Sequence, residues 1–173
     1  MNNDLPIEIK HNKKVFLRLF ISLLVTTPIL IYFCFQTLQS DSYFWLGIVS
    51  SIISLFMVMS IFANLVKYLN KKPVLIVDKE GIIDNISTGK FALIKWKDIK
   101  SIEYIKYVNT HYYIIFVHNP QEYIDQTSGM INKMVTRLYE DKGSPIAINP
   151  RLLDFNKEEL LELWQNEIAI HHS

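Results

Sequence analysis

The hydrophobic positions fall into two long uncharged stretches, followed by a region of short apolar segments. No charged residue occurs between Leu19 and Ser40 or between Ser42 and Val66, and only Asp41 separates the two stretches. About 20 apolar helical residues span a bilayer core, which is about 30 Å thick. A signal peptide would have only one apolar stretch, of about 7–15 residues. The pattern therefore predicts a two-span hairpin within residues 16–66, with helices at about 18–38 and 44–66.

Beyond the hairpin, short apolar runs alternate with turn residues, which is typical of β-strands. The expected strands include 74–78, 82–86, 91–96, 112–118 and 145–148. Between 91–96 and 112–118, Ile99, Ile102 and Tyr104 mark a bend that leads into a further strand, which ends at about Val108. Short strands at about ten-residue spacing indicate an antiparallel meander rolled into a barrel or sandwich.

Helical spacing appears at three places after the last long strand. A short helix is expected over 121–126. Thr127 or Ser128 can cap a second helix, which ends at Gly143 and whose apolar positions are Met130, Ile131, Met134, Val135 and Leu138. A third helix begins after Asn156, with Glu159 at the capping-box position. Its apolar face consists of Leu160, Leu161, Leu163, Trp164 and Ile168. This amphipathic C-terminal helix needs a partner surface, and the open end of a small barrel would provide one.

Basic residues flank the hairpin on one side only, and the short loop between the two spans contains none. The positive-inside rule therefore predicts a multi-pass protein of the cell (inner) membrane with both termini in the cytoplasm. The residues that set this topology are Lys10, Lys13, Lys14, Arg18, Lys67, Lys71 and Lys72. The expected organisation is a cytoplasmic segment over 1–15, the hairpin over 16–66 and a cytoplasmic domain over 73–173.

No Asp, Glu, Lys or Arg lies inside either uncharged stretch, which argues against a transporter or channel. The second span has a stripe of small residues, formed by Gly47, Ser50, Ser51 and Ser54. Such a stripe allows close helix packing. We favour packing against the first span, and a homo-oligomer contact through the transmembrane helices is the alternative.

The sequence contains no recognisable catalytic motif, cofactor site or metal site. The single cysteine, Cys34, lies inside the first span, and the five histidines lack the spacing of zinc ligands. Residues 73–173 contain 11 Lys and Arg against 14 Asp and Glu, a net charge of −3. This balance argues against nucleic-acid binding. The densest basic cluster alternates with acidic residues and is interpreted as a solvated strand face: Lys95, Lys97, Lys100 and Lys106. We therefore expect no enzyme.

Three segments resemble a known family. The segment 74–104 contains the motifs Leu75-Ile76-Val77, Gly81-Ile82 and Ile94-Lys95-Trp96-Lys97-Asp98-Ile99. Through these motifs it resembles the bacterial pleckstrin-homology-like domains that are attached to membrane helices. The stretches 117–124 and 143–160 resemble the narrower STM3941-type family. The resemblance implies a seven-stranded barrel capped by a C-terminal helix, and residues 120–143 interrupt that pattern. It implies no activity.

Taken together, the sequence predicts an α+β membrane protein: a two-helix transmembrane hairpin followed by a pleckstrin-homology-like small β-barrel with a C-terminal helix. Because no charged residue lies inside the two long apolar stretches, we expect the hairpin to anchor the protein and not to conduct ions or solutes. We expect a membrane-anchored cytoplasmic interaction module that binds a protein partner at the inner face. Two alternatives stay open, an immunity protein against a membrane- or cytoplasm-acting toxin and a lipid-acting membrane enzyme. A toxin gene in the neighbourhood would favour the first alternative, and a lipid-turnover activity would favour the second.

Overall fold

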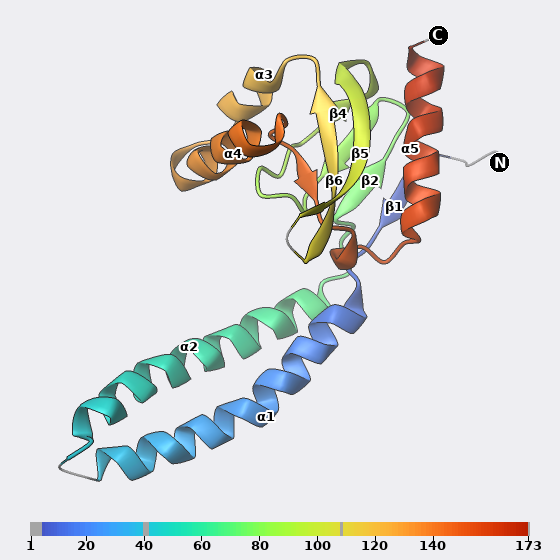
Figure 1. Ribbon diagram of the computed structural model, residues 1–173. Helices are drawn as coiled ribbons and strands as arrows, with labels where there is room; N and C mark the ends of the chain where they lie inside the picture. Colours follow the sequence, from blue (N-terminus) through green and yellow to red (C-terminus); the bar gives the residue numbers. More distant parts are fainter. Residues whose placement is uncertain (1–4, 40–41, 108, 173) are drawn as a thin grey trace. The chain divides into compact units, whose positions relative to one another are not determined.

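The computed structural model describes residues 5–39, 42–107 and 109–172 (Figure 1). The chain divides into two units. One unit is the helical hairpin over Asn12–Lys71, and the other, called the domain below, joins the residues up to His11 with those from Lys72 onward. The expected loop residue Asp41 and the expected strand end Val108 lie outside the described residues. The protein is thus α+β, with two long apolar helices followed by antiparallel sheets.

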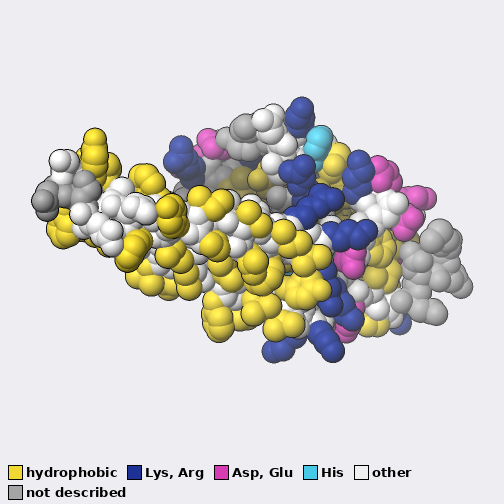
Figure 2. Space-filling model, turned by 90° about the horizontal axis from the view of Figure 1, so that it is seen from below, with side chains coloured by type: hydrophobic (Ala, Val, Ile, Leu, Met, Phe, Trp, Pro, Cys, Tyr) yellow, Lys and Arg dark blue, Asp and Glu magenta, His cyan; other side chains and the backbone are white. Residues whose placement is uncertain are grey.

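The hairpin consists of α1 (Lys13–Leu38) and α2 (Phe44–Leu69), and both helices are long and apolar enough to cross a membrane. Only 11% of the most apolar window of α1 and 17% of that of α2 are buried. The core helix of a soluble protein would be mostly buried. These two helices instead leave most of their apolar surface exposed, which is unfavourable in water and favourable in a lipid bilayer. Figure 2 shows hydrophobic side chains covering the visible surface along the hairpin.

The first sheet of the domain begins before the hairpin. The strand β1 (Ile7–Ile9) pairs antiparallel with β2 (Leu75–Val77), with Ile9 opposite Leu75 and Ile7 opposite Val77. Residues 1–15 were expected to form a segment of their own, and instead three of them form the edge of this sheet. The hairpin is therefore inserted between two paired strands of one domain.

Two antiparallel sheets form the domain. The strand order is β1-β2-β3-β4 in the first and β5-β6-β7 in the second. The remaining strands are β3 (Gly81–Asp84), β4 (Ile94–Lys95), β5 (Ile99–Tyr107), β6 (Thr110–Val117) and β7 (Ala147–Ile148). Between the sheets the chain turns through the 3-10 helix η1 (Trp96–Asp98). A second 3-10 helix, η2 (Pro150–Leu152), follows β7.

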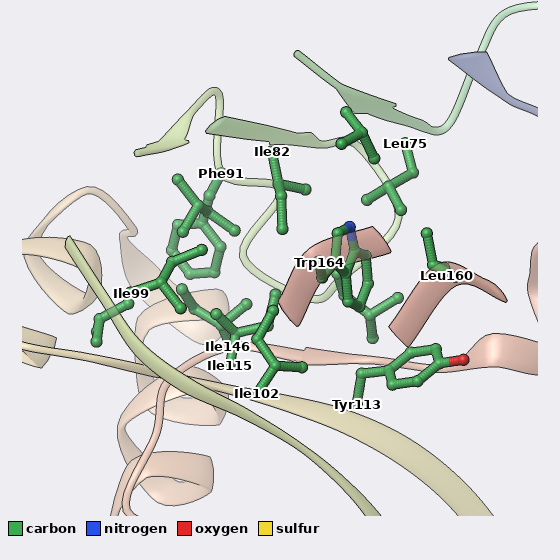
Figure 3. Close-up of a cluster of buried hydrophobic side chains, with 14 of the residues drawn as sticks. Leu75, Ile82, Phe91, Ile99, Ile102, Tyr113, Ile115, Ile146, Leu160 and Trp164 are labelled. Atoms are coloured by element: carbon green, nitrogen blue, oxygen red, sulfur yellow. The ribbon is translucent and has the colours of Figure 1, made fainter. Parts of the chain in front are cut away.

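The expected closed barrel is wrong. The strands β4 and β7 have only two residues each, so neither offers enough ladder to join the sheets into a ring. The space between the sheets is filled by α5 (Lys157–His171). Figure 3 shows Trp164 and Leu160 of this helix between Leu75 and Ile82 of the first sheet and Tyr113 of the second. Because the helix supplies core side chains itself, the sheets need not close.

Local signals at the start of α5 agree with the sequence. The Asn156 side chain accepts hydrogen bonds from the backbone N–H groups of Glu158 and Glu159, at 2.9 and 3.4 Å, which makes it the N-cap. The Tyr113 hydroxyl donates to the Lys157 carbonyl at 2.6 Å. These bonds fix the first turn of α5 against β6.

The insertion between β6 and β7 forms two helices, α3 (Pro120–Asp125) and α4 (Gly129–Lys142). Gly143 ends α4 in the left-handed conformation, with φ 74°, which glycine adopts without a steric penalty. In Figure 1, α4 lies on one side of the second sheet and α5 on the other. The insertion therefore covers the face of that sheet that points away from the core.

We predict that Ile9→Ala destabilises the domain by about 2–5 kcal/mol, because Ile9 is 1% exposed within the core cluster and its truncation leaves a cavity. Thermal unfolding of the full chain in detergent, followed by near-UV circular dichroism of the buried Trp96 and Trp164, measures the effect. Glu8→Ala is the control on the same strand, because Glu8 is exposed. Equal melting of both variants would mean that β1 contributes nothing to the core.

Candidate functional site

The basic residues predicted to set topology gather at one end of the hairpin. Lys13, Lys14 and Arg18 lie in the first turns of α1, and Lys67 lies in the last turn of α2, with Lys71 just beyond. Two cation–π contacts cross between the helices there. The Lys13 ammonium lies 5.7 Å from the Tyr68 ring centre, and the Lys67 ammonium lies 6.0 Å from that of Phe16. The two remaining basic residues, Lys10 and Lys72, belong to the domain and are exposed.

The seam between α1 and α2 follows a three-four spacing of shielded residues, as in a coiled coil. The shielded positions that follow this spacing are Phe16, Phe20, Leu23, Thr27, Leu30, Cys34 and Thr37 on α1, and Gly47, Ser50, Ser54, Met57, Ile61, Asn64 and Tyr68 on α2. The small residues allow close approach. A Cβ atom on Gly47 would lie 2.6 Å from the Leu38 side chain, and the Cys34 Sγ lies 2.9 Å from the Ser51 Oγ.

The small-residue stripe of α2 therefore packs against α1, as predicted. Because this stripe is used inside the hairpin, an oligomer contact would use the outward faces of the helices, where large apolar side chains are exposed.

A groove lies between α4 and the outer face of the second sheet. It has a volume of about 220 Å³ and its lining is mostly apolar: Thr88, Ile105, Tyr112, Ile114, Met134, Leu138, Lys142 and Ala147. Ile105 and Tyr112 are cross-strand partners, as are Ile114 and Ala147, so the strand register brings these side chains to one face. The groove is smaller than typical small-molecule sites of roughly 300–1,000 Å³ and suits a single apolar side chain.

The apolar face predicted for α4 is only partly covered by the sheet. Val135 is fully buried and Leu138 is half-buried, whereas Met130, Ile131 and Met134 are 78%, 46% and 53% exposed. Helical spacing correctly identified these positions as one apolar side of a helix. It does not show how much of that side the rest of the domain covers, and so neither the groove nor the exposed residues were predicted.

The tyrosines of the domain divide between core and surface. Tyr113 and Tyr123 are buried, and burial raises the pKa of both hydroxyls. The Tyr123 hydroxyl donates a hydrogen bond to Asp98 Oδ2 at 3.3 Å, which joins α3 to η1. Tyr104 is half-buried and stacks on His111 with ring centres 5.0 Å apart. These contacts are structural, and none brings a nucleophile and a base together.

Metal-ligating side chains do not converge within the described part of the chain. No group of three or more His, Cys, Asp or Glu residues there could hold an ion. The rings of His118 and His172 lie 6.2 Å apart, centre to centre, at the exposed ends of β6 and α5. The basic residues Lys95, Lys97, Lys100 and Lys106 are all exposed and line no pocket that we identify among the described residues.

Comparison of the chain with protein-family models, with curated proteins and with solved structures finds no match. Function is therefore inferred from the residues themselves. The basic end of the hairpin and the groove beside α4 are the features that the geometry singles out.

Asp84 is a buried carboxyl whose role is structural. One of its oxygens accepts hydrogen bonds from the Ile86 and Ser87 N–H groups, at 3.0 and 2.9 Å, and so shapes the turn after β3. Burial raises the pKa of this carboxyl, and the hydrogen bonds from Ser87 and Ile86 oppose the shift.

We predict that this raised pKa makes the domain less stable as pH rises. An acid with a raised folded-state pKa keeps its proton longer in the native state than in the unfolded state. Its stabilising effect is therefore full below the ordinary pKa of 3.8 and is lost as pH rises through the folded-state pKa. Asp84→Asn keeps the acceptor and should remove this contribution. Asp84→Ala should cost about 1–3 kcal/mol, because two buried N–H groups lose their partner. Melting curves between acid and neutral pH test both variants, and an unchanged pH slope in Asp84→Asn would contradict the assignment.

Proposed function

We propose that this protein is a membrane-anchored cytoplasmic interaction module, held by its hairpin in the cell (inner) membrane and binding a protein partner. The insertion of the hairpin between paired strands carries this proposal. Because Ile9 and Leu75 are neighbours in one sheet, the chain must leave the domain and return to it on the same side of the membrane. That requires an even number of spans, which agrees with two apolar helices.

The distribution of charge supports a cytoplasmic domain. The basic residues of the hairpin lie at the end from which the chain continues into the domain. Residues of this kind are retained on the cytoplasmic side during insertion. The opposite end of the hairpin begins α2 with Phe44 and Trp45, which are 54% and 62% exposed and suit the outer interface.

We infer further that the domain is related to the pleckstrin-homology-like fold. Support comes from two antiparallel sheets and a C-terminal helix packed on their core, in the expected chain order. The open arrangement of the sheets and the insertion that forms α3 and α4 distinguish this domain from the expected barrel.

The groove beside α4 supports binding of a protein partner. Its floor is a sheet face that includes Ile105 and Ile114, and Leu138 of α4 lines its wall. A pocket of this size takes one apolar anchor residue, which is how a few buried contacts supply most of the binding energy in protein interfaces.

The topology has a direct test with single cysteines in a Cys34→Ser background, where serine can keep the hydrogen bond to Ser51. We expect Ser42→Cys to react with a membrane-impermeant maleimide on intact cells, and Gln165→Cys, exposed on α5, to react only after the membrane is broken. The reverse pattern would overturn the cytoplasmic assignment.

Partner binding has a second test. Three forms of the full chain are extracted in detergent and used as bait: the wild type, Ile105→Glu and Ile170→Glu. Ile105→Glu puts a charge into the groove, and Ile170→Glu is the control, because it changes an exposed isoleucine on α5. We expect a protein that is captured by the wild type and by Ile170→Glu and lost with Ile105→Glu, because an anchor contact is worth about 2 kcal/mol or more. Equal capture by both variants would remove the groove from the interface. No enrichment over an unrelated two-span membrane protein would argue against the interaction module itself.

A further inference from the structure

The helix α4 presents an exposed ridge formed by Met130, Ile131 and Met134 together with Lys133 and Arg137, called the α4 ridge below. Its three apolar members are 78%, 46% and 53% exposed. Isolated surface hydrophobic residues need no explanation, but three within five positions of one helix form a patch. A surface of this kind on a stable domain points to a contact outside the domain.

The turns that carry the exposed apolar residues also carry two cations, Lys133 and Arg137, and no acidic residue lies between Gly129 and Tyr139. Glu140 and Asp141 follow in the last turn and line a cavity together with these two cations. Neither Lys133 nor Arg137 makes an ion pair within the described part of the chain. Their long apolar stems can lie along the ridge while the charged ends reach outward. Apolar residues flanked by cations are typical of helices that lie in a membrane interface.

The covalent links to the hairpin hold the domain beside a bilayer. Three residues, 10–12, connect β1 to α1, and five residues, 70–74, connect α2 to β2. An extended chain covers about 3.3–3.6 Å per residue, so these links keep the attachment point within about 20 Å of the hairpin end. Tethering makes docking on the same membrane intramolecular, so that weak contacts suffice. This step rests on the membrane anchoring proposed above.

We propose that the α4 ridge docks on the anionic phospholipid surface of the membrane that holds the hairpin. The three apolar side chains enter the boundary between headgroups and acyl chains, and Lys133 and Arg137 contact lipid phosphates. A second copy of the chain fits this surface less well, because a two-fold contact would bring the four cations of two ridges together. Clusters of Lys and Arg on an amphipathic helix are also typical of binding to anionic lipid.

The test uses the full chain with Cys34→Ser and Met130→Cys, carrying an environment-sensitive nitrobenzoxadiazole label at position 130. The protein is reconstituted in nanodiscs of phosphatidylcholine mixed with phosphatidylglycerol, or of phosphatidylcholine alone. We expect blue-shifted emission and quenching by headgroup-level spin-labelled lipid in the anionic discs, and weaker effects in the neutral discs. The same label at Gln165→Cys, exposed on α5, is the positional control and should report water in both.

A matched pair of charge variants tests the electrostatic part. Lys133→Gln with Arg137→Gln should lower the ratio of docked to free ridge about 30-fold in anionic discs, since each charge near such a surface is worth about 1 kcal/mol. Lys95→Gln with Lys97→Gln removes the same net charge from exposed positions elsewhere on the domain and should leave the ratio unchanged.

Several outcomes would overturn the docking. The label at position 130 would stay as water-exposed as that at position 165, or the two charge pairs would act alike. Shielding that needs no lipid and grows with protein concentration in detergent would identify a second copy, and shielding only on addition of another protein would identify a protein partner. Flotation with the lipid shows separately whether the hairpin inserts. A chain that inserts and leaves α4 in water refutes the docking alone, whereas a chain that fails to insert refutes the anchoring as well.

Discussion

The pairing of β1 with β2 is the constraint on which the arrangement of this chain depends. Three residue pairs join the two strands, although the intervening chain, residues 10–74, is long. The entropic cost of closing a flexible loop rises with its length. Here the packing of α1 against α2 holds the two ends of this intervening chain close together. The hairpin therefore lowers the cost of a contact that two three-residue strands would not support alone.

The core of the domain depends in turn on α5, because the two sheets do not close around it. Trp164 and Leu160 of α5 are buried in the core between the two sheets. The bond from Tyr113 to Lys157 holds the first turn of this helix to β6. Each part of the domain thus completes another: β1 extends the first sheet, α5 fills the centre, and α4 covers the outer face of the second sheet.

The features that could be predicted from sequence are those encoded locally. Long uncharged stretches identified α1 and α2, Asn156 identified the start of α5, and Gly143 the end of α4. The strand β1 could not be predicted, because Ile7–Ile9 is short and its partner lies beyond the hairpin. Barrel closure was predicted wrongly for a related reason, since periodicity identifies strands and carries no information on which edges pair.

The exposure of the apolar side chains on α4 could not be predicted from the sequence, for a different physical reason. The spacing of Met130, Ile131 and Met134 has the same form whether the helix packs on a sheet or faces an outside surface. Only the arrangement of the second sheet decides that Val135 is covered and Met130 is not. The groove likewise arises from cross-strand neighbours such as Ile105 and Tyr112, which are distant from α4 in the chain.

The hairpin is one continuous segment between two paired strands, so it can be removed without dividing the domain. Ile9 and Leu75 face each other across the sheet, and the Val74 N–H donates to the Ile9 carbonyl at 2.8 Å. A two-residue Asn-Gly connection is the shortest common link between antiparallel strands. Replacing the hairpin unit, residues 12–71, with a short turn-forming link would join the two strands directly and would keep Val74, which is buried in the core of the domain. The membrane segment and the domain are therefore separable by design at one point of the backbone, which opens a route to a lipid-free form of the domain for crystallisation.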